Sequence, residues 1–328
     1  MGRLFGGLLT LIGLIALVAV GGYFALKRDD IPYETLAARY ENAASRYVDL
    51  PNGVRMHYRA QGADGPVLLL IHGYSASLHT WEPWAERLGD EYRVISIDLP
   101  GHGLTSAPAG YAASIGAYRD LVEAFAQAQG LTHFAIAGNS MGGRVAWEYA
   151  LAHPERVDAL ILVDAAGFVD RPDENAQEPI AFKLIRNPIT GPLLLNLDNT
   201  AVVREGLGKS FADPAFVSDE MVARYVDLSR APGHRQILLA MMTNPQTPAT
   251  AEQLAAIDRP TLIIWGDKDN LIPVRHAELF RAAIANSRVQ IFENVGHLPQ
   301  EEVADASADT VREFLYPVYE SVSPEGVE

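Results

Sequence analysis

Residues 134–143 read FAIAGNSMGG, an apolar run that leads into a serine flanked by glycines. Gly138 and Gly142 each stand two residues from Ser140, which produces the pattern G-x-S-x-G. A strand that turns sharply into a helix needs small neighbours there, because the central serine is strained and crowded. Such a turn exposes the serine hydroxyl to a substrate. The stretch predicts that Ser140 is a catalytic nucleophile, and the alternative is a glycine-rich turn without chemistry.

A serine hydroxyl needs a base to remove its proton and a third group to orient that base. His297 follows the apolar run at 289–292, and Asp269 follows another run at 262–265. The carboxyl ends of parallel strands meet at one edge of a sheet, where α/β folds place their ligands. The sequence therefore predicts a catalytic triad of Ser140, Asp269 and His297.

Two other acids are candidates for the orienting role. Asp164 ends the apolar run at 160–163, and Asp267 stands two residues before Asp269. Both positions are also strand ends, so the sequence leaves them open as alternatives.

A tetrahedral intermediate requires backbone N–H donors aimed at its oxyanion. Met141 follows the nucleophile at a predicted helix start, where the helix dipole adds to the N–H group. The second donor is expected from the loop after the apolar run at 67–71. Gly73 permits a backbone bend in that loop, which makes Tyr74 N–H the predicted second donor and Ser75 the alternative.

Short apolar runs alternate with helical periodicity along most of the chain, which predicts parallel βαβ units in a doubly wound, mostly parallel sheet. The first two predicted strands are antiparallel, around the turn Pro51-Asn52-Gly53. Eight strands are expected, over residues 46–50, 55–59, 67–71, 94–97, 134–137, 160–163, 262–265 and 289–292. Helices are expected over residues 81–88, 118–129, 143–153, 276–285 and 304–315.

One long segment interrupts this alternation. Residues 167–250 show helical patterns and many prolines but no clear buried strand, which is too much for an ordinary crossover. We predict a helical cap insertion at 167–250, within an α/β core formed by 31–166 and 251–320. Residues 29–44 read as a polar linker, and 321–328 as a C-terminal tail.

These motifs make the chain resemble the α/β-hydrolase fold superfamily, of the capped serine esterase and lipase type, and similar to meta-cleavage-product hydrolases. The resemblance covers about residues 46–316, including the chain order of serine, acid and histidine. Its motifs besides the serine turn are His72-Gly73, DLPGHG at 98–103, GDKD at 266–269 and Gly296-His297. The resemblance implies structural roles for His72 and for the 98–103 turn.

The identity of the nucleophile narrows the chemistry that the resemblance implies. Epoxide hydrolases and haloalkane dehalogenases carry aspartate where Ser140 stands, so both classes are excluded. Meta-cleavage carbon–carbon hydrolases usually carry tryptophan after the catalytic histidine, where this chain has Leu298. We therefore expect carboxylic ester hydrolysis. A carbon–carbon hydrolase and a ligand-binding member of the fold with slow turnover remain alternatives.

Composition limits the kinds of molecule that this protein is expected to bind. The formal net charge of −15 and the pI near 5.0 disfavour nucleic acid. The chain has no cysteine, so disulfides and thiolate metal ligands are excluded. No metal-binding or phosphate-loop motif is present, and no cofactor is expected. The predicted partner is a small-molecule ester or a lipid, and the oligomeric state is left open.

The N-terminus differs from the rest of the chain. Residues 4–26 contain no charged side chain, and a helix needs about 20 apolar residues to span a bilayer. We predict an uncleaved N-terminal membrane anchor over residues 1–30. The alternatives are a cleaved signal peptide, whose apolar region is usually about 7–15 residues, and a buried helix.

The positive charges on the two sides of this anchor are nearly balanced, so they give little indication of its orientation. Arg3 and the terminal amine stand on one side, and Lys27 and Arg28 stand on the other. Because the N-terminal tail is so short, we expect it inside, with the catalytic domain on the non-cytoplasmic side of the cell membrane.

The predicted cap contributes apolar side chains for a substrate pocket. Candidates for the lining are Phe182, Leu184, Leu193, Leu194, Leu195, Met241 and Met242, with Trp81 and Trp84 on the opposite side. An apolar lid over a serine beside a membrane favours hydrophobic acyl esters.

Overall fold

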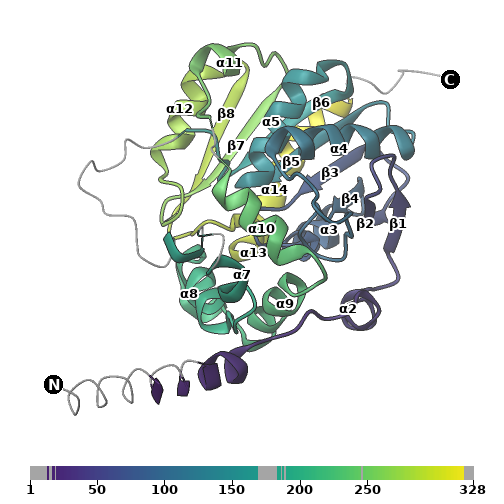
Figure 1. The fold of residues 1–328 in the computed structure, drawn as a ribbon. Helices are drawn as coiled ribbons and strands as arrows, with labels where there is room; N and C mark the ends of the chain where they lie inside the picture. The colour runs from purple at the N-terminus through teal and green to yellow at the C-terminus, as the bar shows by residue number, and fades with distance from the viewer. Residues whose placement is uncertain are drawn as a thin grey trace.

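An eight-stranded sheet forms the centre of the protein, in the order β1-β2-β4-β3-β5-β6-β7-β8 (Figure 1). The computed structural model describes residues 13–14, 17–18, 20–168, 183–185, 187, 190–244 and 247–320. The strands are β1 (Ser45–Asp49), β2 (Arg55–Gly62), β3 (Val67–Ile71), β4 (Arg93–Ile97), β5 (Phe134–Asn139), β6 (Val157–Val163), β7 (Thr261–Gly266) and β8 (Ser287–Phe292). β1, β2 and β4 pair antiparallel, and all other neighbours pair parallel. The predicted eight-stranded, mostly parallel sheet is confirmed.

Helices cover both faces of the sheet. The helices outside the predicted cap are α2 (Tyr33–Tyr40), α3 (Glu82–Leu88), α4 (Ile115–Ala128), α5 (Met141–Ala152), α11 (Ala251–Ala255), α12 (Arg275–Ala283), α13 (Pro299–Glu302) and α14 (Ala304–Glu320). Apolar residues of α4, α5 and α12 pack on one face, and those of α3 and α14 pack on the other. The central strands are therefore buried on both sides, which is why they read as continuous apolar runs.

Between β6 and α11, the residues that the structure describes contain no strand. The helices of this stretch include α7 (Gly191–Leu194), α8 (Thr200–Ser210), α9 (Asp219–Ser229) and α10 (His234–Thr243). Figure 1 shows α7, α8 and α9 grouped beyond one end of the sheet. Apolar side chains of α8, of α9 and of residues next to them pack together, and Leu298 joins this cluster from the loop after β8. The helical character predicted for this segment is confirmed where the structure describes it.

Two expectations about smaller segments are wrong. Residues 33–40 form α2 rather than a linker, because Leu36 is fully buried against Leu104, Leu228 and Ala231. Trp81 and Trp84 do not line a pocket; both are buried in the core between the sheet, α3 and α14.

The chain at the end of the predicted anchor is bonded to the segment between β6 and β7. Arg28 N–H donates to Asn196 O at 2.7 Å, and Ile31 N–H donates to Arg230 O at 2.8 Å. Half of the predicted anchor lies outside the described residues. Among the helices that are described, none combines the length and the apolar content that crossing a membrane requires, so the anchor stays a prediction.

Candidate active site

Ser140 occupies a strained turn between β5 and α5. Its backbone has φ 55° and ψ −117°, a combination that non-glycine residues adopt only when the surroundings enforce it. The enforcing contacts are two backbone hydrogen bonds: Ser140 N–H donates to Val163 O at 3.0 Å, and Ala166 N–H donates to Ser140 O at 2.9 Å. The turn predicted around Ser140 is therefore present, fixed to the end of β6.

The glycines of this turn are required by close backbone contacts. A Cβ at position 138 would lie 2.2 Å from Gly142 C, and one at position 142 would lie 2.1 Å from Ile71 O. A Cβ at position 143 would lie 2.5 Å from the Ala165 side chain. Any larger residue at these positions would push α5 away from β3 and β6.

His297 and Asp269 are in direct contact. His297 Nδ1 and Asp269 Oδ2 lie 2.6 Å apart, and both side chains are buried. Asp269 Oδ1 accepts hydrogen bonds from Leu271 N–H at 2.7 Å and Ile272 N–H at 3.0 Å. Burial alone would raise the pKa of Asp269, but the hydrogen bond from His297, its charge and these two N–H groups hold the pKa below its ordinary value. The pair can therefore present an oriented imidazole beside a carboxylate.

The two alternative acids have other partners. Asp267 accepts from Asn294 N–H at 2.6 Å and pairs with Lys268 at 2.8 Å. Asp164 is fully buried and accepts from Gly266 N–H at 3.1 Å. Of the three acids proposed from sequence, Asp269 is the one bonded to His297.

The serine turn and the histidine loop are joined by Asn139. Its side-chain Nδ2 donates to His297 O at 3.0 Å and to Val163 O at 3.2 Å. His297 N–H donates to Ser210 O at 2.6 Å, at the end of α8. The backbone of His297 is thereby fixed between the serine turn and the predicted cap.

The loop predicted to supply the second oxyanion donor lies against Ser140. A Cβ on Gly73 would lie 3.2 Å from Ser140 Cβ, a close contact that a larger residue could make only if its neighbours shifted. Ser75 has a positive φ of 59°, which turns the chain after Tyr74. The Tyr74 hydroxyl donates to Leu238 O of α10 at 2.9 Å. Met141, the other predicted donor, is the first residue of α5, where helix N–H groups have no intrahelical acceptor.

His72 has a structural role, as expected. Its Nδ1 bonds to Gly73 O at 2.7 Å, and its Nε2 accepts from Leu99 N–H at 3.1 Å. Burial lowers the pKa of His72, which favours the neutral ring that these two bonds require.

Asp98, at the start of the 98–103 turn, is also structural. Its two carboxylate oxygens accept from Leu78 N–H at 2.8 Å and Leu104 N–H at 3.0 Å, and His57 lies 2.7 Å away. Both of its oxygens are bonded, and these bonds hold the surrounding loops together.

One group of side chains in the described residues has the composition of a metal site. Ligand atoms of Asp164, Asp269 and His297 all lie within 4.8 Å of one another. The direct bond between His297 Nδ1 and Asp269 Oδ2 already uses two of the atoms that a cation would need. The arrangement therefore fits an acid–base pair better than a cation site.

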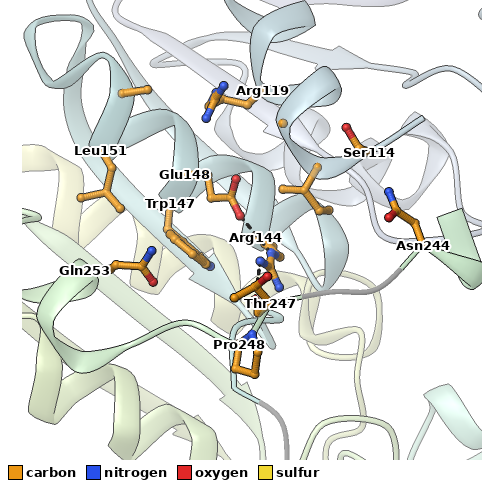
Figure 2. Close-up of a pocket in the computed structure, with 13 residues that line it drawn as sticks. Ser114, Arg119, Arg144, Trp147, Glu148, Leu151, Asn244, Thr247, Pro248 and Gln253 are labelled. Carbon is orange, nitrogen blue, oxygen red and sulfur yellow. Dashed lines mark hydrogen bonds and ion pairs between the residues drawn. The ribbon is translucent and has the colours of Figure 1, made fainter. Parts of the chain in front are cut away.

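One cavity lies away from these residues. It has a volume of about 600 Å³ and is bounded by α4, α5 and the residues Asn244, Thr247, Pro248 and Gln253. Figure 2 shows Arg144 of α5 inside it, beside Glu148 and Thr247. None of Ser140, Asp269, His297, Tyr74 or Met141 lines it. A second cavity, of about 380 Å³, borders Lys268 and Asn270 and likewise excludes the five.

Two supporting residues were missed by sequence reasoning. Asn139 lay inside the serine motif without an assigned role, although an amide so close to a nucleophile is a usable signal. Glu302 accepts from Gly296 N–H at 2.8 Å and Ala212 N–H at 3.1 Å. It thereby ties the histidine loop to the segment after α8, a link that the sequence gives no means of finding.

Sequence comparisons relate the chain to known proteins. A family model described as alpha/beta hydrolase fold matches residues 66–304. The dihydrolipoyllysine-residue acetyltransferase component of the acetoin cleaving system of Cupriavidus necator is 30% identical over 311 residues, covering 92% of this chain and 78% of that protein.

Comparison with solved structures finds proteins of similar fold. A membrane phospholipase A, described as a novel bacterial virulence factor, superposes with a TM-score of 0.71 at 29% identity, covering 97% of this chain and 99% of the other. A variant of a meta-cleavage product hydrolase superposes with a TM-score of 0.71 at 25% identity, covering 84% and 98%. Strand order, serine turn and sequence matches agree, and the chain belongs to the alpha/beta hydrolase fold family.

Proposed function

We propose that this protein is a serine hydrolase that cleaves carboxylic esters through an acyl-enzyme on Ser140. The observation that carries the proposal is the buried 2.6 Å contact between His297 Nδ1 and Asp269 Oδ2. With Nδ1 engaged, His297 keeps Nε2 for the proton of a serine hydroxyl. The hydrogen bond from Asn139 to His297 O, which joins the histidine loop to the serine turn, supports this role.

The reaction runs in two halves. His297 removes the Ser140 proton while the hydroxyl oxygen attacks the ester carbonyl, and the N–H groups of Tyr74 and Met141 stabilise the oxyanion. His297 then protonates the leaving alcohol. In the second half it activates water to release the acid, while Asp269 holds the imidazole tautomer and stabilises its charged form.

A hydrophobic acyl group is the proposed substrate feature. Leu298, directly after His297, is buried with Leu207, Phe211, Val222 and Val226 of the predicted cap. This apolar cluster, directly beside the histidine, supports a hydrophobic acyl group. The solved relative named as a membrane phospholipase A supports a lipid or long-chain ester as substrate.

The proposal includes the N-terminal anchor over residues 1–30 and a catalytic domain on the non-cytoplasmic side of the membrane. It is supported by the 23 uncharged residues at 4–26. The predicted cap spans residues 167–250, and the bonds of Arg28 and Ile31 to Asn196 and Arg230 would hold it near the end of the anchor. Protection of the domain from protease added to intact spheroplasts would contradict this orientation.

The test of the proposed chemistry is covalent labelling of the full chain in detergent with a fluorophosphonate. Labelling and hydrolysis of p-nitrophenyl esters are expected for the wild type and absent in Ser140→Ala and His297→Ala. His133→Ala, at an exposed ion pair remote from the site, is the matched control and should label normally. Rates should rise with acyl length. Labelling that survives Ser140→Ala would refute the assignment.

A carbon–carbon hydrolase is the second candidate, favoured by the structural match to a meta-cleavage product hydrolase. It predicts hydrolysis of a vinylogous diketone in preference to p-nitrophenyl esters. Measuring both substrates with one preparation separates the two reactions.

A further inference from the structure

Asp164 is a buried carboxyl group behind the proposed acid–base pair. It follows β6 and is fully buried, with a positive φ of 43°. Its backbone N–H donates to Ile264 O at 2.9 Å, and its Oδ1 accepts from Gly266 N–H at 3.1 Å. The mechanism proposed above does not use this side chain.

The second oxygen of Asp164 has no donor. Oδ2 is buried and receives no hydrogen bond from the part of the chain that the structure describes. Its carboxyl lies with the Asp269 carboxyl and the His297 ring in a group whose atoms are within 4.8 Å of one another. Among the described residues no lysine or arginine forms an ion pair with Asp164. Two carboxyl groups this close cannot both be ionised in a buried site.

The partners of the two acids decide which one holds the proton. Asp269 receives three hydrogen bonds, from His297 Nδ1, Leu271 N–H and Ile272 N–H, which stabilise its charged form. Asp164 receives one, from Gly266 N–H. Burial raises the pKa of Asp164 well above its ordinary value, and the negative charges of Asp269 and Glu302 add to that rise. The proton therefore belongs to Asp164, and its free position is Oδ2.

We propose that Asp164 is a positioning residue that acts as a neutral acid: its Oδ2–H donates to the Asp269 carboxylate and holds that carboxylate toward His297. The inference rests on the proposed function, since it assigns a role within the same site. Asp269 then accepts hydrogen bonds from His297, from two backbone N–H groups and, on its other side, from Asp164. A carboxylate bonded on all sides cannot rotate away from the imidazole during the reaction.

Two substitutions separate this role from a structural one. Asp164→Asn keeps an acceptor for Gly266 N–H and supplies an amide N–H for Asp269, so kcat should fall only slightly. Asp164→Gly removes the donor, and glycine suits the positive φ. Its kcat should fall about 10–100-fold with KM nearly unchanged, the range seen when outer hydrogen-bond partners are lost at metal sites. Asp158→Asn, at the other end of the same strand, is the matched control.

The pH profile tests the charge of Asp164. The groups that face it are Asp269, His297 and Glu302. If Asp164 is neutral, Asp164→Asn removes no charge, and the acidic limb of the kcat/KM profile stays in place. If Asp164 were ionised, the variant would lose a negative charge beside the imidazole, and the limb would move to lower pH. Such a movement, or a wild-type kcat in Asp164→Gly, overturns the proposal.

Infrared spectroscopy provides a readout that does not depend on turnover. The carbonyl band of a protonated carboxylic acid should persist in the wild type at pH 8 and disappear in Asp164→Asn, but not in Asp158→Asn. Glu301, whose pKa burial raises to about 7, is mostly ionised at that pH. Absence of the band refutes the neutral acid even if Asp164→Gly fails to fold. A band together with labelling that survives Ser140→Ala would refute the ester-hydrolase assignment alone.

Discussion

Asn139 Nδ2 donates to His297 O at 3.0 Å, across 158 positions of sequence. The residue before the proposed nucleophile thus binds the backbone of the proposed base. Asn139 is buried, so this bond is not exchanged for one with water. The serine turn and the histidine loop are therefore held together by a bond that involves neither the serine hydroxyl nor the imidazole ring.

Asn139→Ala removes this link. A buried carbonyl left without its donor costs about 1–3 kcal/mol, so the free energy of unfolding should fall by about that amount in urea denaturation. The rate of ester hydrolysis should fall as well, because His297 loses its fixed distance from Ser140. Asn196→Ala, which removes an exposed amide bonded to Pro192 O, should change neither quantity. Equal effects of both variants would contradict the role of Asn139.

Asp269→Asn tests the choice among the three candidate acids. An amide cannot accept the Nδ1 proton in the same way and favours the wrong imidazole tautomer, so kcat should fall by about 10⁴-fold, as in other triads. Asp267→Asn should have far less effect, because Asp267 binds Asn294 N–H and Lys268 rather than His297. Measuring kcat of both variants by steady-state kinetics shows which acid orients His297. A larger loss in Asp267→Asn would reverse the assignment.

The sheet and the contact between Asp269 and His297 were predictable because their signals are local. An apolar run followed by a polar residue marks a strand end, and parallel strand ends converge by topology. The glycines around Ser140 likewise predict a tight turn. No distance between segments had to be known for these predictions.

What the sequence could not provide is the packing between distant segments. Residues 33–40 are polar enough to read as a linker, and their helix depends on the burial of Leu36 against residues far along the chain. Trp81 and Trp84 are as apolar as pocket residues, and only the packing of α14 over the sheet buries them in the core. The link from Asn139 to His297 O depends in the same way on how β5 and the loop after β8 meet.

Gly142→Ala should destabilise the protein and abolish activity. The new Cβ would lie 2.1 Å from Ile71 O and 2.5 Å from His72 O, and these atoms belong to the backbone and cannot move aside. We expect a loss of at least about 1–3 kcal/mol, the usual range for overpacking. Gly206→Ala, in α8 with no atom within 4 Å of the new methyl, should gain up to about 1 kcal/mol from helix propensity. Thermal unfolding of the pair checks the sign of both changes.

Arg235→Met should loosen the chain at the end of the predicted anchor. Arg235 is buried; it donates to Arg28 O at 2.9 Å and Leu195 O at 3.1 Å, and it pairs with Asp30. Hydrogen bonds from a charged donor contribute about 1.5–3 kcal/mol. Hydrogen exchange of residues 27–31 should therefore accelerate.

Arg230→Met is the control for this effect, since Arg230 donates to Asp29 O from an exposed position. It should accelerate exchange much less than Arg235→Met. The same rate in both variants would show that Arg235 does not fix the segment.

Glu301 should make the stability fall as pH rises toward neutral. Burial raises its pKa from 4.5 to about 7, while Thr80 Oγ1 donates to it at 2.5 Å. Between these two values the folded protein holds a proton that the unfolded chain has lost, so the free energy of unfolding decreases with pH in that window and levels off above it. Glu301→Gln cannot ionise and still accepts from Thr80. Thermal unfolding at pH 5 and pH 8 should show a smaller decline for Glu301→Gln than for the wild type, and equal declines would mean that Glu301 titrates normally.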